Sequence, residues 1–497
     1  MFGFFLSSGL FLGWSLGAND ASNVFGTAVG TKMIRFRTAA IYCSIFIILG
    51  SVISGAGASH TLGKLGAVNA TAGAFIVALA AGVSVYMMTR LRYPVSTSQA
   101  IVGAIIGWNI FSGSLTDTDS LTKIVLTWVA CPLLSALIAV VLYKLMSAFI
   151  LARNVHMFKL DAMTRYGLLI VGALGSYSLG ANNIANVMGV FVPVSPFSDI
   201  SVFGWFHLSS AQQLFFVGGV AIAVGVFTYS RRVMETVGQG IMNLSPVAAL
   251  AVVAAHSTVL FLFASQNLED FLATHGLPTI PLVPVSSSQA IVGAVIGVGL
   301  LKGGRCIRWR TLGGITSSWV VTPIIAGLIS LVSLFFLQNV FEQKTFRPVA
   351  YQMTPAALAR IERADINKKK LAELVGKKFA NAVEFDRILD KMGLEAKQRS
   401  LILKAAEIDA IVVSSAAVAR IDPHWFSPEQ LNSLKHLQGR TFTHKWQLLE
   451  ALARQSDQWR FAPGNTPHNQ NLQHKLSYLY RLLRSGKPHR PLNPADK

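Results

Sequence analysis

Two polar blocks, each present twice in the chain, contain the residues best suited to binding ions. GANDASNVFGTAVG at 17–30 is followed by GANNIANVMGVFVP at 180–193, and PVSTSQAIVGAIIG at 94–107 is followed by PVSSSQAIVGAVIG at 284–297. All four blocks lie within long apolar stretches, where polar and charged side chains are costly to bury. Such side chains are functional candidates, and their types indicate what they bind.

The Gly-Ala-Asn blocks predict a cation site. Asp20 is the one acidic residue in the middle of an apolar run, and a carboxylate there costs about 3 kcal/mol or more. Gly17 is expected to break its helix and free backbone carbonyls for a cation. The side-chain ligands, suited to Na⁺, are predicted to be Asn19, Asp20, Asn23, Asn182, Asn183 and Asn186. The alternative is that these side chains only hold helices together.

The Pro-Val-Ser blocks predict an anion site. Proline is favoured in the first turn of a helix, and serine or threonine at its cap. A helix that begins there directs free N–H groups and its positive dipole end toward a bound oxyanion. Further neutral donors, which can also release an anion, are Ser96, Thr97, Ser98, Gln99, Ser286, Ser287, Ser288 and Gln289. The alternative is two capped helices without a ligand.

Few other side chains in the apolar runs could take part in chemistry. Arg90 and Arg92 either attract anions or extend to the membrane interface. Glu235 is expected at the interface, and His256 is expected to contact neighbouring helices rather than to relay protons. Metal-ligand spacing is absent from the three cysteines, Cys43, Cys131 and Cys306. No cofactor is expected, and the only ions predicted are transported Na⁺ or H⁺.

Composition divides the chain into a membrane part and a water-soluble part. The chain is 52% hydrophobic and 13% charged, with a mean hydropathy of +0.49, which is outside the range of ordinary soluble domains. Residues 1–341 contain 17 Lys/Arg and 8 Asp/Glu, whereas residues 342–497 contain 26 and 15. Because both parts are basic, the net charge of +20 does not indicate one nucleic-acid-binding surface, and no nucleic acid is expected.

Ten apolar runs form two sets of five in the same order. They lie at 3–29, 38–58, 68–89, 95–112 and 122–151, and at 166–193, 211–229, 245–266, 285–301 and 314–338. TWVACP at 127–132 also returns as SWVVTP at 318–323. Residues 1–155 and 156–341 are therefore predicted to be two transmembrane repeats. A transporter built from two such halves can form one polar site at the middle of the bilayer.

The basic loops suggest how the repeats are oriented. Four basic segments, at 32–37, 153–165, 231–232 and 302–310, can all be cytoplasmic if each half contains one re-entrant hairpin. Each half then crosses an odd number of times, so the halves are inverted. The predicted fold is an all-α polytopic membrane protein of two inverted repeats with broken helices and re-entrant hairpins, followed by a small helical soluble domain.

Residues 342–497 are predicted to be a helical accessory domain or a partner-binding module. The segments 354–379 and 474–487 are predicted to be amphipathic helices, and the more apolar segment 405–419 is expected in the core. A basic helix on anionic lipid headgroups is the alternative role. The side of the membrane on which this domain lies stays open.

The repeated blocks resemble the signature of the inorganic phosphate transporter (PiT) family over about residues 5–338. The resemblance implies cation-coupled uptake of inorganic phosphate on an inverted-repeat fold; some relatives carry sulfate. The family's motif positions match Asn19, Asp20, Asn23, Ser96, Thr97, Ser98, Asn182, Asn186, Ser286, Ser287 and Ser288.

This chain departs from the family pattern at four positions. Asn183 replaces the second aspartate, Gln99 and Gln289 replace a histidine, and Ile47 replaces a glutamate. Fewer proton acceptors suit sulfate, which carries no proton. We therefore expect a phosphate symporter that works by alternating access in the cell (inner or plasma) membrane, with a sulfate permease as the alternative. An anion-sensing receptor is the rival of a different class, no enzymatic site is visible, and a homodimer is an open alternative.

Overall fold

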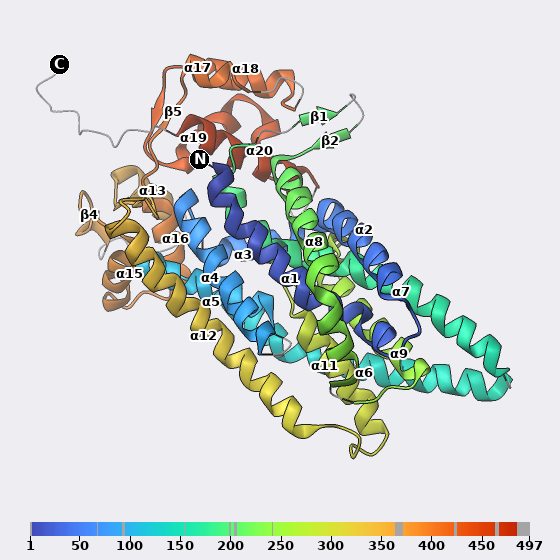
Figure 1. Ribbon diagram of the computed structural model, residues 1–497. Coiled ribbons are helices and arrows are strands. Elements are labelled where there is room, and N and C mark those ends of the chain that lie inside the picture. Colours follow the sequence, from blue (N-terminus) through green and yellow to red (C-terminus); the bar gives the residue numbers. More distant parts are fainter. Residues whose placement is uncertain are drawn as a thin grey trace, which may run out of the picture. The chain divides into compact units, whose positions relative to one another are not determined.

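The computed structural model describes residues 2–66, 68–91, 95–153, 155–197, 200–202, 206–240, 242–362, 371–421, 425–462 and 467–484. Arg92, Pro94 and the side chain of Glu235 lie outside the described residues. The chain forms two compact units, Met1–Arg347 and Pro348–Lys497 (Figure 1). The second unit thus begins at Pro348, after the boundary of the soluble domain that was predicted at residue 342.

In the residues that the structure describes, the regular elements of the first unit are helices apart from one short strand pair. Its first half contains α1 (Phe2–Gly30), α2 (Phe36–Ser54), α3 (Ala56–Leu65), α4 (Thr71–Arg90), α5 (Thr97–Ser112) and α6 (Thr118–Arg153). Its second half contains α7 (Met157–Met188), the 3-10 helix η1 (Gly189–Val194), the antiparallel strands β1 (Ile200–Val202) and β2 (Phe206–Leu208), α8 (Ser210–Gly240), α9 (Pro246–Ala264), α10 (Gln266–Thr274), α11 (Ser287–Leu301) and α12 (Trp309–Asn339).

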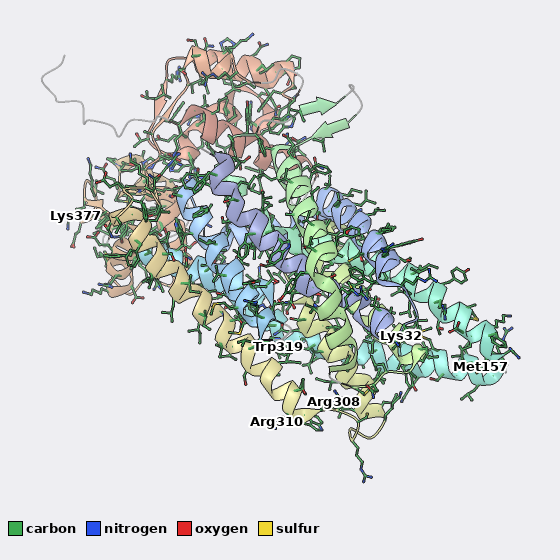
Figure 2. The ribbon with its side chains drawn as sticks, in the orientation of Figure 1. Lys32, Met157, Arg308, Arg310, Trp319 and Lys377 are labelled. Carbon is green, nitrogen blue, oxygen red and sulfur yellow. The ribbon has the colours of Figure 1, made fainter. Side chains whose placement is uncertain are left out.

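Seven helices in the described part of the chain are long and apolar enough to cross a membrane, namely α2, α4, α6, α7, α8, α9 and α12. By contrast, α5 has 16 residues and α11 has 15, about 24 Å of helix against a hydrocarbon core of about 30 Å. These lengths fit the predicted re-entrant segments. Lys32, Met157, Arg308 and Arg310 lie toward the same end of this unit (Figure 2), as the predicted cytoplasmic loops require.

The predicted helix break at Gly17 is wrong, because α1 continues through it to Gly30. A Cβ atom on Gly17 would lie 2.0 Å from the carbonyl oxygen of Ile222 in α8. In the second half, a Cβ on Gly180 of α7 would lie 2.2 Å from the carbonyl oxygen of Ile47 in α2. Both glycines therefore permit close helix packing. The helix break lies instead at the turn residue Gly55, between α2 and α3.

The two halves exchange equivalent contacts. α1 packs on α8 while α7 packs on α2, and α5 packs on α12 while α11 packs on α6; Figure 1 shows α12 running along α4 and α5 of the other half. Added Cβ atoms on Gly103 and Gly293 would lie 2.1 and 2.2 Å from the carbonyl oxygens of Pro323 and Pro132. Such reciprocal exchange is expected of two halves related by a two-fold axis.

The segment after α12 stays with the first unit until Arg347. The indole Nε1 of Trp108 donates to the carbonyl oxygen of Thr345 at 3.2 Å. Asn69 donates to the carbonyl of Arg347 and accepts from its backbone N–H, both at 2.8 Å. These contacts hold residues 345–347 against α5 and the segment just before α4, so these residues belong with the membrane helices rather than with the second unit, the tail.

The second unit contains strands as well as helices. Its elements are β3 (Tyr351–Gln352), α13 (Pro355–Glu362), β4 (Lys378–Phe379), α15 (Ala382–Lys391), α16 (Ala396–Ala406), β5 (Ile411–Val412), α17 (Ser415–Val418), α18 (Pro428–His436), β6 (Thr441–Phe442), α19 (Lys445–Gln455), the 3-10 helix η2 (Asp457–Trp459) and α20 (Pro467–Leu483). The single helix predicted over 354–379 is wrong: Gly376, with φ +83°, turns the chain into β4, which pairs with β3.

This unit is a tandem duplication. The segment TPAALARI at 354–361 returns as SSAAVARI at 414–421, and each copy pairs its two strands antiparallel. Gly376 and Gly439 precede the second strand of each copy with φ values of +83° and +81°. Each copy has its own hydrophobic core. His444 links the copies, because Nδ1 lies 2.7 Å from the carbonyl oxygen of Glu407 and Nε2 lies 3.0 Å from Thr354 Oγ1.

Candidate functional site

The four repeated blocks meet inside the first unit. All fourteen predicted ligands are buried there, none more than 3% exposed. The helices α5 and α11 begin at the Pro-Val-Ser blocks, where the hydroxyl oxygens of Ser96 and Ser286 accept from the backbone N–H groups of Gln99 and Gln289 at 3.2 Å. Capping chemistry thus aims the first turns of both helices into the same buried region.

Asparagines of each half contact the serine block of the other half. Asn23 Nδ2 donates to Ser287 Oγ at 3.1 Å, and Asn186 Nδ2 donates to Ser98 Oγ at 2.9 Å. The predicted cation ligands and the predicted anion ligands are therefore in direct hydrogen-bond contact.

Other donors of these blocks are satisfied by backbone carbonyls. Asn19 Nδ2 donates to Val95 O at 3.1 Å and Asn182 Nδ2 to Val283 O at 3.3 Å. The hydroxyls cross between halves, because Ser98 donates to Val285 O and Ser288 donates to Val95 O, both at 3.0 Å. The extended segments before α5 and α11 are thereby held side by side.

The acceptors of the same amides lack partners. Within the four repeated blocks, six buried amide oxygens have no hydrogen-bond donor among the described residues, those of Asn19, Asn23, Asn182, Asn186, Gln99 and Gln289. A buried polar atom left unsatisfied costs about 1–3 kcal/mol, and a hard cation satisfies carbonyl oxygens of this kind. The arrangement can therefore hold Na⁺ through neutral oxygens.

Charge and donor capacity differ between the two halves. Asp20 is the one buried carboxylate in the described part of the first unit, and its Oδ1 lies 3.5 Å from Asn23 Nδ2. At the equivalent position, the oxygen of Asn183 accepts from Asn186 at 3.0 Å and Nδ2 has no acceptor among the described residues. The oxygen of Asn183 is therefore already engaged, and its Nδ2 is an unused donor among the described residues; the prediction that Asn183 is a cation ligand stays a prediction.

One contact was missed by the sequence reasoning. His256, in α9, is completely buried, and its Nε2 lies 2.9 Å from Ser287 Oγ. The expected contact with a neighbouring helix is therefore a contact with the predicted anion site; the available signal was a lone histidine in an otherwise apolar run. Arg90 lies exposed, with its guanidinium 5.7 Å from the ring centre of Tyr86, and is not part of this buried cluster. Within the described residues, no group of three or more His, Cys, Asp and Glu side chains could hold a metal ion.

Comparisons with known proteins match the same region. The profile described as "Phosphate transporter family" matches residues 16–330, with a second match over 275–453. A putative phosphate permease of Methanocaldococcus jannaschii is 29% identical over 64% of this chain and 91% of its own length. One from Pyrococcus furiosus is 26% identical over 65% of this chain and 92% of its own length.

A solved structure shares the fold. It is titled "The sodium-dependent phosphate transporter", is 23% identical, and aligns with a TM-score of 0.54 over 68% of this chain and 99% of that chain. The membrane-spanning helices, the duplicated blocks and the family profile agree, and this multi-pass membrane protein belongs to the phosphate transporter family.

Proposed function

We propose that this protein is a secondary transporter that carries inorganic phosphate together with Na⁺ across the cell membrane by alternating access. The observation that carries the proposal is the shared use of Asn23 and Asn186. Each amide donates its nitrogen to a serine of the anion block and leaves its oxygen without a donor among the described residues. A cation bound to that oxygen would fix the amide and, through it, the serine, so cation binding favours anion binding.

The energetics require this coupling. Moving one negative charge inward across 100 mV costs about 2.3 kcal/mol, and a divalent anion costs about twice that before any concentration gradient. At least two cations must therefore accompany each divalent phosphate. Amide oxygens bind Na⁺ but hold no proton at neutral pH, so the six free oxygens favour Na⁺ over H⁺. The related structure is described as sodium-dependent, which supports the same choice.

The donor and acceptor inventory favours phosphate over sulfate. Hydrogen phosphate carries an O–H group and needs an acceptor, whereas sulfate needs donors only. The hydroxyl oxygen of Thr97, in the first turn of α5, has no partner among the described residues. It can accept a hydrogen bond from the O–H group of hydrogen phosphate. Sulfate remains the second candidate because Gln99 and Gln289 stand where the family pattern has a titratable histidine.

We further propose that residues 1–155 and 156–341 are inverted repeats whose relative movement exposes the site to each side in turn. The reciprocal packing of α1 on α8 and α7 on α2 supports this arrangement. Residues 348–497, the second unit, are proposed as an accessory domain outside the transport pathway.

Proteoliposome uptake tests these proposals. Purified protein should accumulate labelled phosphate under an inward Na⁺ gradient, more strongly than labelled sulfate and more strongly than under an H⁺ gradient alone. A protein that binds phosphate in detergent but shows neither uptake nor counterflow would be a receptor and would refute the transporter assignment.

A further inference from the structure

The hydroxyl of Ser287 has two nitrogen neighbours inside the site. Asn23 Nδ2 donates to Ser287 Oγ at 3.1 Å, and His256 Nε2 lies 2.9 Å from the same atom. His256 and Ser287 are 0% and 2% exposed, so bulk water does not compete for these contacts. If His256 Nε2 donates to Ser287 Oγ, the Ser287 hydroxyl is free to donate to another group; if Nε2 accepts, the hydroxyl is used by His256.

The surroundings of the second ring nitrogen select the tautomer of His256. Nδ1 has no hydrogen-bond partner among the described residues and is buried. A proton on Nδ1 would create an orphaned buried N–H, which native proteins almost always avoid; a bare nitrogen lone pair is the smaller loss. The proton therefore belongs on Nε2, where it is donated to Ser287 Oγ.

We propose that His256 is a positioning residue that makes Ser287 an obligate hydrogen-bond donor to the transported oxyanion. With N–H groups of Asn23 and His256 filling both lone pairs of Ser287 Oγ, its hydroxyl hydrogen must point away from both nitrogens and is left to bond the anion. This inference rests on the proposed function, because it assigns a role within the anion site of the transporter.

The arrangement is absent from the other half. The segment AAGVS at 80–84 aligns with AAHST at 254–258, so Gly82 stands where the second half has His256. A Cβ on Gly82 would lie 2.9 Å from Phe11 Cδ1, which leaves no room for an imidazole. Thr97, the counterpart of Ser287, keeps an unpartnered hydroxyl oxygen among the described residues. Ser287 therefore contacts an unprotonated oxygen of the anion, and Thr97 is free to accept from a protonated one.

A double-mutant cycle tests the proposal through the Michaelis constant for phosphate at saturating Na⁺. His256→Met and Ser287→Ala should each raise that constant about tenfold, since each weakens or removes the one hydrogen bond that Ser287 donates to the charged anion. The double variant should be no worse than either single variant, because His256 acts through Ser287. His256→Gln, whose amide can place an N–H near the position of Nε2, should restore most of the affinity.

Two controls separate positioning from general damage. Ser257→Ala removes a buried hydroxyl next to His256 whose hydrogen-bond partners among the described residues are the carbonyl oxygens of Val171 and Val253, and it should leave the Michaelis constant for phosphate unchanged. The half-saturating Na⁺ concentration at saturating phosphate should move by less than the phosphate constant in His256→Met, whereas structural damage would shift both. The tautomer is read independently from the ¹⁵N shifts of labelled wild-type protein, which should show the proton on Nε2.

Three results would overturn the role of His256 while wild-type transport stands. They are a Michaelis constant for phosphate in the double variant that rises by the product of the two single effects, an unchanged constant in His256→Met, and a proton on Nδ1. If the wild type carries neither phosphate nor sulfate, the proposed function fails and this role fails with it. Where His256→Met does not insert into the membrane, His256→Gln and the ¹⁵N measurement decide.

Discussion

Replacing Asp20 by asparagine should abolish concentrative uptake without unfolding the protein. Asparagine has nearly the same volume as aspartate, and Asp20 is 2% exposed, so the packing of α1 on α8 is preserved. What the change removes is the one buried carboxylate in the described part of the membrane unit. The neutral oxygens around it remain.

The size of the effect follows from the loss of a buried ionic partner. Removing one member of such a pair costs about 3–5 kcal/mol, which at about 1.4 kcal/mol per tenfold is roughly 100- to 4000-fold weaker binding of the cation at this position. A carrier that takes one cation fewer leaves one negative charge uncompensated, and inward movement then costs about 2.3 kcal/mol more at 100 mV.

The assay is phosphate accumulation in proteoliposomes under an inward Na⁺ gradient, with thermal unfolding in detergent as the check of folding. Asp161→Asn is the matched control, because this carboxylate is half exposed and pairs with Arg165 at 2.8 Å on the surface of α7. It should transport as the wild type does. Wild-type accumulation by the Asp20→Asn variant would refute the assignment of Asp20 to the cation site.

Four further outcomes are expected. Replacing all of Ser286–Ser288 by alanine should raise the phosphate Michaelis constant by some tens-fold; an unchanged constant would place the anion elsewhere. Gly17→Ala should lower thermal stability by about 1–3 kcal/mol, because its Cβ would lie 2.0 Å from a backbone carbonyl, whereas Gly313→Ala, with nothing within 4 Å, should not; equal stabilities would contradict the close packing. Burial lowers the pKa of His444 below its ordinary 6.5, so the folded second unit favours the neutral ring and its stability should fall as the pH drops below about 6.5. Hydrogen exchange of residues 441–447 in the full chain, corrected for intrinsic rates, should therefore be faster at pH 5.5 than at pH 7.5. Equal protection at the two pH values would refute this prediction. A protein ending at Arg347 should still insert and carry phosphate, with at most an altered rate, and a folded but inactive product would make the tail part of the transport machinery.

Local chemistry made part of the site predictable from the sequence. The starts of α5 and α11 follow from the capping serines Ser96 and Ser286, which needs no knowledge of distant contacts; the prolines precede these caps instead of lying in the first helical turn. The burial of the asparagines and serines follows from their place in apolar runs. What these side chains contact could not be predicted, because Asn23 and Ser287 are 264 residues apart in the chain.

Non-local contacts also explain why some predictions from the sequence were wrong or incomplete. Gly17 could either break a helix or permit close packing, and the carbonyl of Ile222 in α8 decides for packing. A lone histidine in an apolar run is ambiguous in the same way until its partner is known. The duplication in the tail, by contrast, has a visible signal in TPAALARI and SSAAVARI, and Gly376 with its positive φ ends what composition alone would extend as helix.

The helix packing is equivalent in the two halves, whereas the charge of the buried site is not, and the two features serve different steps of the proposed transport. Close glycine contacts occur in both halves at nearly the same distances, as the proposed alternating access requires, because it needs two equivalent ways of packing the same helices. The charge occurs once, at Asp20, with Asn183 in the equivalent position. In the proposed transport cycle, a site loaded with two Na⁺ and one divalent phosphate would carry the same net charge as the empty site, namely that of one carboxylate. A second carboxylate would have to cross the hydrocarbon core on every return step of the empty carrier, at a cost of about 3 kcal/mol or more. A single carboxylate surrounded by neutral amide oxygens therefore supplies the attraction for cations while keeping the empty site able to reorient.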